Sequence, residues 1–207
     1  MMHNAPHLHV ILLAAGASTR FADGPKQQAL VHGEPMLHRA ARMVMGAGAA
    51  LSVVLGAHAR ILQPLLADLE LDVLFNPDWK SGLGSSIACG VRHVQSQHPE
   101  SSAILLCLAD QPQVDRARLQ PLLEAHRQHP QRIVCVDHGP VPGPPCLFPR
   151  AFFQELAGCS GPRGASALLQ AHCGQCIVLK MPEARMDIDT TADLTRLHAL
   201  APQDPVP

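Results

Sequence analysis

An apolar run, Val10 to Ala14, passes into a turn of small residues that is followed by Arg20 and Lys26. Such a turn can point backbone N–H groups at an anion, and a guanidinium and an ammonium nearby add positive charge. These groups are suited to holding a polyphosphate, which indicates a protein that handles nucleotides. The alternative interpretation is that Arg20 and Lys26 are two solvated loop cations.

The spacing of the glycines excludes two common phosphate-binding motifs. The turn contains a single glycine, Gly16, so it lacks the G-x-G-x-x-G pattern of dinucleotide-binding folds. Lys26 follows Gly24 and Pro25, but the residue directly after it is Gln27 and not Ser or Thr, so the P-loop pattern is absent as well. The turn therefore predicts another kind of nucleotide site.

A carboxylate follows a second apolar run. The run from Ala103 to Leu108 predicts a central strand, and Asp110 stands just beyond its carboxyl end. Ligands of open α/β sheets gather at that edge, so Asp110 is placed to reach them. An acid at this point can also cap the next helix, but Asp115 is already available for that.

Two further acids, Asp187 and Asp189, stand before the last helical stretch. A second carboxylate close to Asp110 would complete an oxygen-donor site suited to Mg²⁺. Only one of the two is expected to face the site, with Asp189 preferred over Asp187. The alternative is that Asp189 or Thr190 caps the final helix.

A segment rich in glycine and serine, residues 82–86, precedes another helical stretch. Glycines such as Gly82 let the backbone approach a flat base, and the hydroxyl of Ser86 can bond to the edge of that base. These features predict a nucleobase subsite. A helix N-cap explains Ser85 or Ser86 equally well.

The order Leu13-Ala14-Ala15-Gly16, Ser18, Arg20 and Lys26 resembles the signature of the nucleotidyltransferases that load CTP or GTP onto the molybdenum cofactor. Further segments around residues 76–86, 106–112 and 187–194 extend the resemblance over most of the chain. In the last of them, Thr191 and Ala192 replace the Pro and Glu of the family's D-I-D-T-P-E-D-L ending. The resemblance implies a three-layer, Rossmann-like nucleotidyltransferase fold that uses Mg²⁺.

The resemblance also implies a role for each matched residue. The implied catalytic residues supply charge beside the reacting phosphates: Lys26, Arg20 and Asp110. The implied nucleotide-binding residues surround the base and the triphosphate: Leu13, Ala14, Ala15, Gly16, Gly82 and Ser86. The implied metal ligands are Asp110 and Asp189, and the implied contacts of the second substrate are Pro145 and Arg163.

The two segments that carry Pro145 and Arg163 resemble the family's G-x-P-x-x-F and G-D-x-G-A elements. Pro162 stands where the second element usually has an acid, so this part is not expected to carry catalysis. Arg163 is suited to a phosphate because a guanidinium can bond to two phosphate oxygens at once.

The resemblance implies transfer of a nucleotidyl group to the terminal phosphate of molybdopterin, with release of pyrophosphate. Ala15 stands where guanylyl-transferring members typically carry a second glycine, which favours CTP over GTP. A molybdenum hydroxylase or its chaperone would then be a partner. Two alternatives stay open: an enzyme of the same fold that acts on a sugar phosphate or another small phosphate, and a non-catalytic maturation protein that binds nucleotide or cofactor.

Composition narrows the protein class. A chain of 207 residues with 47% hydrophobic content can bury one core, so we expect one domain over residues 1–200 and a frayed tail over 201–207. A net charge of −1 and scattered basic residues predict no nucleic-acid partner. No run approaches the roughly 20 apolar residues of a membrane span, and seven irregularly spaced cysteines indicate reduced thiols in the cytoplasm.

The hydrophobic pattern predicts how these residues are positioned. Short apolar runs predict strands at 8–14, 51–55, 71–75, 103–108, 132–136 and 176–180. Helical spacing between and after them predicts helices at 35–47, 58–69, 85–97, 115–129, 149–156 and 162–172. Apolar strands alternating with helices favour an α/β fold with a mostly parallel sheet and helices on both faces.

Three segments do not follow this pattern. The proline-rich stretch 136–148 is expected to form a rigid loop or an irregular hairpin beside the substrate. The pair Cys173 and Cys176 is most economically a turn, with a zinc site or a redox pair as alternatives. Finally, His3, His7 and His9 are expected on a mobile tail.

Overall fold

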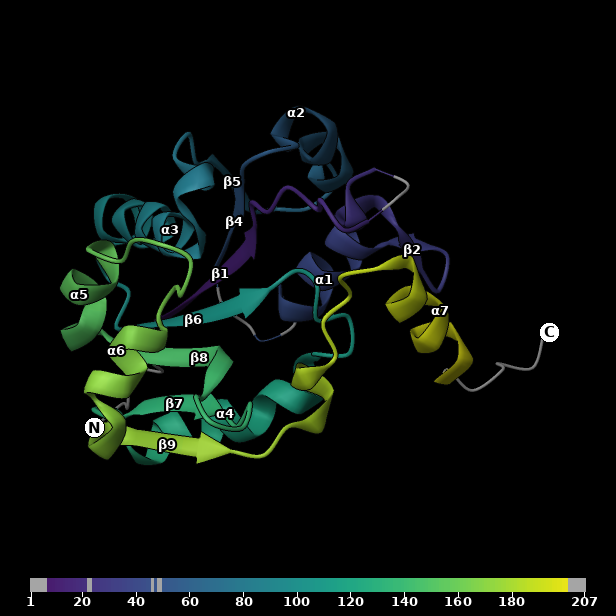
Figure 1. Ribbon diagram of the computed structural model, residues 1–207. Helices are drawn as coiled ribbons and strands as arrows, with labels where there is room; N and C mark the ends of the chain where they lie inside the picture. The colour runs from purple at the N-terminus through teal and green to yellow at the C-terminus, as the bar shows by residue number, and fades with distance from the viewer. Residues whose placement is uncertain (1–6, 22–23, 46, 48–49, 201–207) are drawn as a thin grey trace.

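A seven-stranded sheet runs through the centre of the computed structural model, which describes residues 7–21, 24–45, 47 and 50–200 (Figure 1). Its strands lie in the order β5-β4-β1-β6-β8-β7-β9. Their bounds are β1 (Leu8–Ala14), β4 (Ala50–Leu55), β5 (Asp72–Phe75), β6 (Ala103–Leu108), β7 (Ile133–Val136), β8 (Gly143–Pro149) and β9 (Cys176–Leu179). Within this described sheet only β8 runs against its neighbours. The expected mostly parallel sheet is confirmed.

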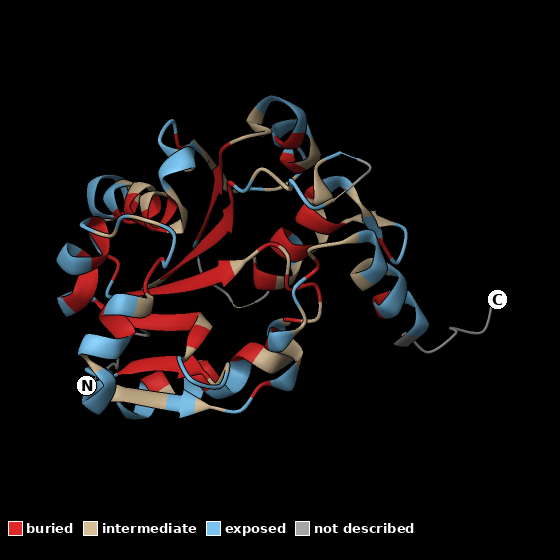
Figure 2. Ribbon diagram, viewed as in Figure 1, coloured by how far each residue is buried: buried red, intermediate tan, exposed pale blue. Residues whose placement is uncertain are grey.

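Helices cover both faces of the sheet, as expected. One face carries α1 (Met36–Met45), α2 (Ala59–Leu62) and α4 (Arg116–Gln128). The other carries α3 (Leu83–Gln97), α5 (Phe153–Ala157) and α6 (Ser166–Ala171). The three-layer arrangement is therefore confirmed: the inner strands are buried in its middle layer, whereas the edge strands β5 and β9 are partly exposed (Figure 2).

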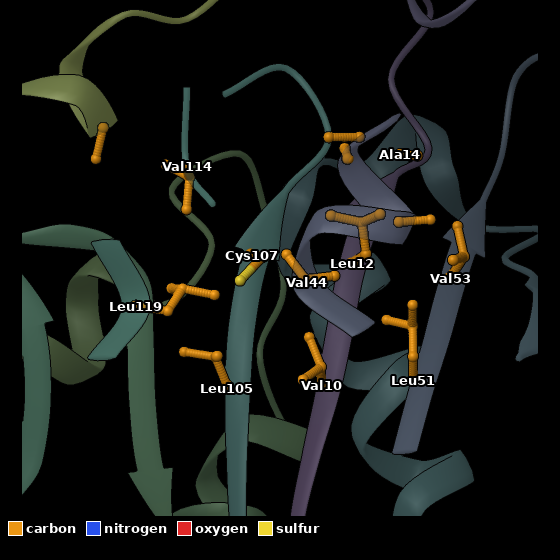
Figure 3. Packing of buried hydrophobic residues seen from close by; sticks show 14 of the residues in the cluster. Val10, Leu12, Ala14, Val44, Leu51, Val53, Leu105, Cys107, Val114 and Leu119 are labelled. Carbon is orange, nitrogen blue, oxygen red and sulfur yellow. The ribbon is translucent and has the colours of Figure 1, made fainter. Parts of the chain in front are cut away.

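The continuous apolar strands follow from this double cover. In β1, Val10 and Leu12 belong to the core cluster on the α1 and α4 face, where Figure 3 shows them near Val44. Ile11 and Leu13 belong to the cluster on the α3 face. Because side chains alternate across a strand, burial on both sides favours apolar residues at most positions.

The proline-rich segment forms a hairpin, so the loop alternative was wrong. β7 and β8 pair antiparallel with a register shift between Val134 and Val136, and β8 inserts between β6 and β7. Three residues at the middle of β8, from Cys146 to Phe148, are completely buried. Proline lacks an N–H group, yet it is tolerated here because Pro144, Pro145 and Pro149 lie towards the ends of the strand.

Several helices are shorter than predicted. The predicted helix 58–69 is α2 followed by a 3-10 turn, Gln63–Leu66, which begins just before Pro64. The predicted helix 162–172 begins only at Ser166, and the predicted helix 149–156 is a 3-10 turn (Arg150–Phe152) followed by α5. By contrast, Asp115 caps α4 as expected, because its Oδ1 accepts a hydrogen bond from the N–H of Arg118 at 2.9 Å.

The last helix, α7 (Thr191–Leu200), lies beside a small hairpin formed by β2 (Leu30–Val31) and β3 (Glu34–Pro35). A third apolar cluster joins these segments: Val31 and Met36 pack with Ile188 and Leu197. His198 adds a hydrogen bond from its Nε2 to the Leu30 carbonyl at 3.1 Å. The segment before α7 is thereby held against the beginning of the chain.

His9 was wrongly placed on a mobile tail. It is the second residue of β1 and is 1% exposed, because β1 lies between β4 and β6 in the middle of the sheet. The expectation for His3 and for the tail 201–207 falls outside the described residues. In the described part of the chain, no helix combines the length and the apolar character needed to cross a membrane.

The burial of His9 makes stability depend on pH. Burial, together with the nearby His98, lowers the pKa of His9 from 6.5 to about 4. His9 therefore takes up a proton near pH 6.5 in the unfolded chain but only near pH 4 in the folded protein. The free energy of unfolding is expected to fall as the pH falls from 6.5 towards 4. We expect a loss of about 2 kcal/mol between pH 7 and pH 5, measured by urea denaturation of metal-free protein.

A His9→Gln variant is expected to lose this part of the pH dependence, whereas His129→Gln, at an exposed position, is expected to keep it. Equal slopes in the wild type and His9→Gln would contradict the assignment.

Candidate functional site

The turn after β1 is held open by side chains from other segments. Ser18 adopts a positive φ of 54°, and its Oγ donates to Gln27 Oε1 at 2.9 Å. The Gln27 amide donates in turn to the carbonyls of Ala14 and Gly16, each at 3.4 Å. His58 Nε2 donates to the Ala17 carbonyl at 3.0 Å. This loop therefore has a fixed shape.

The free side of the same turn is polar and uncrowded. Among the contacts between described residues, the backbone N–H groups of residues 16–20 donate no hydrogen bond. A Cβ added to Gly16 would meet nothing within 4 Å. The turn can therefore offer N–H groups to an anion, as its sequence indicates.

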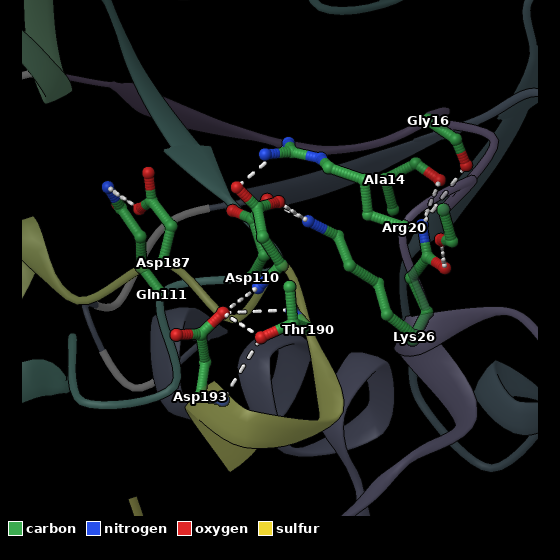
Figure 4. A network of polar contacts seen from close by, with 12 residues as sticks. Ala14, Gly16, Arg20, Lys26, Asp110, Gln111, Asp187, Thr190 and Asp193 are labelled. Carbon is green, nitrogen blue, oxygen red and sulfur yellow. Dashed lines mark hydrogen bonds and ion pairs between the residues drawn. The ribbon is translucent and has the colours of Figure 1, made fainter. Parts of the chain in front are cut away.

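Lys26 lies between two carboxylates that are far apart in the sequence (Figure 4). Its Nζ donates to Asp110 Oδ2 at 2.6 Å and to Asp189 Oδ1 at 2.8 Å. Arg20 completes the group with a contact of 2.9 Å from its guanidinium to Asp189 Oδ2. The structure thus brings together four of the residues that the sequence indicated.

The charge state of Lys26 follows from these neighbours. Burial alone would lower the pKa of Lys26, since only 11% of the side chain is exposed. The charges and hydrogen bonds of Asp110 and Asp189 more than offset this effect and raise the pKa above its usual value. Lys26 is therefore a partly buried ammonium that stays charged at neutral pH.

A helix cap decides which acid faces the site. Thr190 and Asp193 form a reciprocal cap at the start of α7: the Thr190 N–H donates to Asp193 Oδ2 at 2.8 Å, and the Asp193 N–H donates to Thr190 Oγ1 at 3.2 Å. The Ile188 N–H donates to the Asp110 carbonyl at 2.9 Å, which fixes the preceding segment beside β6. Asp189 is not needed as a cap and turns to Lys26.

Asp187 takes a different position. It accepts a hydrogen bond from Gln111 Nε2 at 3.1 Å instead of contacting Lys26. Although part of this residue remains exposed, desolvation by the surrounding chain and the charge of Asp110 raise the pKa of Asp187. The preference for Asp189 over Asp187 therefore agrees with the geometry.

A pocket of about 430 Å³ lies at the carboxyl ends of β1 and β6. It brings together ten residues singled out from the sequence: Leu13, Ala14, Ala15, Gly16, Arg20, Lys26, Gly82, Ser86, Asp110 and Asp189. Sequence reasoning gave no role to several other lining residues, among them Gln27, Lys80 and Leu83. No motif marks Gln27, because its role depends on contacts made only after folding.

The far side of the pocket is formed by the start of α3. The helix begins at Leu83 with Gly82 as its N-cap, so the N-cap alternative for Ser85 and Ser86 was wrong. Ser86 is 2% exposed, and its Oγ accepts from Asn76 Nδ2 at 3.0 Å. This hydrogen bond orients a hydroxyl at the pocket wall.

The residues implied for the second substrate are not part of the pocket lining. Pro145 is buried in β8, and the neighbouring Pro144 carbonyl accepts from His138 Nε2 at 2.6 Å. Arg163 is exposed, but the segment before it touches the pocket wall, since the Gly84 N–H donates to the Gly161 carbonyl at 2.9 Å. The structure therefore does not bring Pro145 or Arg163 to the lining of the pocket.

Comparisons with known proteins agree with this geometry. A family model described as MobA-like NTP transferase domain matches residues 10–176. A curated relative, nicotine blue oxidoreductase from Paenarthrobacter nicotinovorans, is 33% identical over 141 residues, which cover 66% of this chain and 65% of that protein. The match thus spans slightly less than two thirds of this relative.

Solved structures match over nearly the whole chain. Rv0371c from Mycobacterium tuberculosis H37Rv is 27% identical, with a TM-score of 0.79 over 94% of this chain and 99% of that one. A crystal structure of the Rv0371c complex with manganese matches with a TM-score of 0.75, over 94% of this chain and 100% of that one, also at 27% identity.

The close approach at Gly82 predicts a sensitive position. Gly82 has φ +107°, and an added Cβ would lie 2.6 Å from the Gly161 backbone. We expect Gly82→Ala to lower the free energy of unfolding by about 1–3 kcal/mol or more, measured by urea denaturation. Gly174→Ala is the matched control, because an added Cβ there meets nothing within 4 Å. Equal stability of the two variants would show that the contact at Gly82 is not constraining.

Proposed function

Because the chain belongs to the MobA-like NTP transferase domain family, we propose that it transfers a nucleotidyl group from a nucleoside triphosphate to the terminal phosphate of molybdopterin. CTP is the favoured donor, since Ala15 stands where guanylyl-transferring relatives typically carry glycine. The observation that carries the proposal is Lys26 between Asp110 and Asp189, beside an anion-accepting turn. The pocket between this turn and the start of α3 has room for a nucleotide.

The reaction needs charge neutralisation more than a base. The second pKa of a phosphate monoester is roughly 6, so the acceptor is largely a dianion at neutral pH. One of its oxygens attacks the α-phosphorus, and the bond from that phosphorus to the pyrophosphate oxygen breaks. The obstacle is the repulsion between two anions, which fixed positive charges reduce.

Lys26 and Arg20 supply those charges. Lys26 is held in place by two carboxylates and is only partly exposed, so its ammonium acts in a medium of lower dielectric constant than water. Arg20 is more exposed and lies on the other side of Asp189, where its guanidinium can bind the pyrophosphate as it leaves. The N–H groups of the turn add neutral donors.

Asp110 and Asp189 suit Mg²⁺ as ligands. Both offer carboxylate oxygens, which are the donors that this cation prefers, and Asp110 Oδ1 is buried with no partner among the described residues. The match to the manganese complex of Rv0371c supports a divalent cation. When bound, the cation would neutralise phosphate oxygens.

The name of the curated relative points to a second candidate function. Because the chain is 33% identical to a protein called nicotine blue oxidoreductase, a redox reaction in the same pocket is the second candidate. The cluster of charged side chains around Lys26 favours phosphate chemistry, so nucleotidyl transfer is the preferred function. The two candidate reactions are therefore tested side by side.

The test is pyrophosphate release with purified molybdopterin and either CTP or GTP, in Mg²⁺ and in excess EDTA. We expect release with CTP that depends on both acceptor and Mg²⁺. Pyrophosphate release with a sugar phosphate but not with molybdopterin would show that the acceptor is a sugar phosphate. A parallel assay would supply a nicotinamide reductant and an organic electron acceptor; electron transfer between them, with no pyrophosphate release in the first assay, would favour the second candidate.

Substitutions at the central ion pairs test the mechanism. Lys26→Ala and Asp110→Asn are each expected to lower kcat/KM roughly a hundredfold, because one preorganised charge contributes about 3 kcal/mol. Lys180→Ala and Asp68→Asn change the same charges at exposed positions outside the pocket and are expected to be neutral. A fall of less than about tenfold in both site variants would refute these roles.

A further inference from the structure

A second polar cluster lies at the opposite edge of the sheet from the pocket, at the amino ends of the strands. His9 comes from β1, Asp72 begins β5, and His93 and His98 come from the end of α3. His9 shares a face with Ile11 and Leu13, which pack in the cluster that contains α3 residues. The four side chains therefore meet between the sheet and one helix.

The side chains of this cluster converge on a single carboxylate. Asp72 Oδ2 accepts from His93 Nε2 at 2.9 Å and from His98 Nε2 at 2.8 Å. The rings of His9 and His98 lie 4.5 Å apart between centroids. One ligand atom from each of His9, Asp72 and His98 lies within 4.8 Å of the others, and no other group of three such residues in the described chain meets this condition.

His9 has a nitrogen that nothing in the described protein satisfies. Its Nε2 lies 2.8 Å from Ser52 Oγ, and this hydroxyl donates to Asp72 at 3.5 Å. With the proton of His9 on Nε2, the lone pair remains on Nδ1, which is buried and has no partner. A buried acceptor without a partner costs free energy. A cation bound to the His9 ring through this lone pair would remove that cost.

These ligand types select one class of metal. Imidazole nitrogens with a carboxylate are the ligands of Zn²⁺ and related borderline cations, whereas Mg²⁺ prefers oxygen donors. His9 is neutral at neutral pH, which is the form that binds metal. The cluster is also open to entry, because 41% of the Asp72 side chain is exposed.

We propose that His9, Asp72 and His98 form a binding site for Zn²⁺ or a similar cation, distinct from the Mg²⁺ site expected at Asp110 and Asp189. His93 keeps its hydrogen bond to Asp72 and orients that carboxylate, as outer partners do in metal sites. The ion would join β1, β5 and the end of α3, so its role is structural.

The first test uses metal-free protein titrated with Zn²⁺ against a chromophoric chelator. We expect one equivalent to bind, with affinity lowered at least about tenfold in Asp72→Asn and in His98→Gln. His129→Gln is the control for an exposed histidine, and Asp110→Asn separates this site from the proposed active site. Both controls are expected to keep the wild-type affinity. Loss of affinity in Asp110→Asn but not in Asp72→Asn would overturn the proposal.

A second measurement needs no variant of the cluster. Co²⁺ added to the wild-type protein is expected to give visible bands of a nitrogen and oxygen site without thiolate charge transfer in the near ultraviolet. Thiolate charge transfer that disappears in Cys173→Ser would instead place the metal at the Cys173 and Cys176 turn. That result, or the absence of stoichiometric binding, would overturn the proposal.

Discussion

The contact of one ammonium with two carboxylates holds the functional edge of the molecule together. Lys26 follows the first strand, Asp110 follows the central strand β6, and Asp189 precedes the last helix. Without the cation, two partly buried acids would face each other, and the repulsion between their charges would destabilise this arrangement. The same three side chains therefore serve the fold and the proposed chemistry.

Local patterns predicted the parts of this arrangement that depend on neighbouring residues. The apolar run of β1 and the acid after β6 were recognisable because both faces of the sheet are covered and because ligands gather at strand ends. Capping of the last helix by Thr190, which the sequence offered as an alternative, was also encoded locally, since Thr190 and Asp193 have the spacing of a helix cap.

Features that depend on distant contacts could not be predicted in the same way. The prolines around Cys146 left a loop and an irregular hairpin both open, and only the pairing of β8 with two neighbours decides for the hairpin despite the missing N–H groups. Gln27 and His9 carried no signal, because their partners lie in other strands and turns. A histidine near the start of a chain resembles part of a mobile tail, and only the structure shows that His9 belongs to β1.

The position of Asp189 has a consequence for biosynthesis. A ribosome delivers the chain from its amino end, so Lys26 and Asp110 emerge well before the segment that closes the group around the ammonium. Ile188, which packs against Val31 and Met36, arrives at the same time as Asp189. A nascent chain can thus assemble the sheet while its pocket still lacks Asp189, and the pocket is complete only after residues 187–189 have left the ribosome.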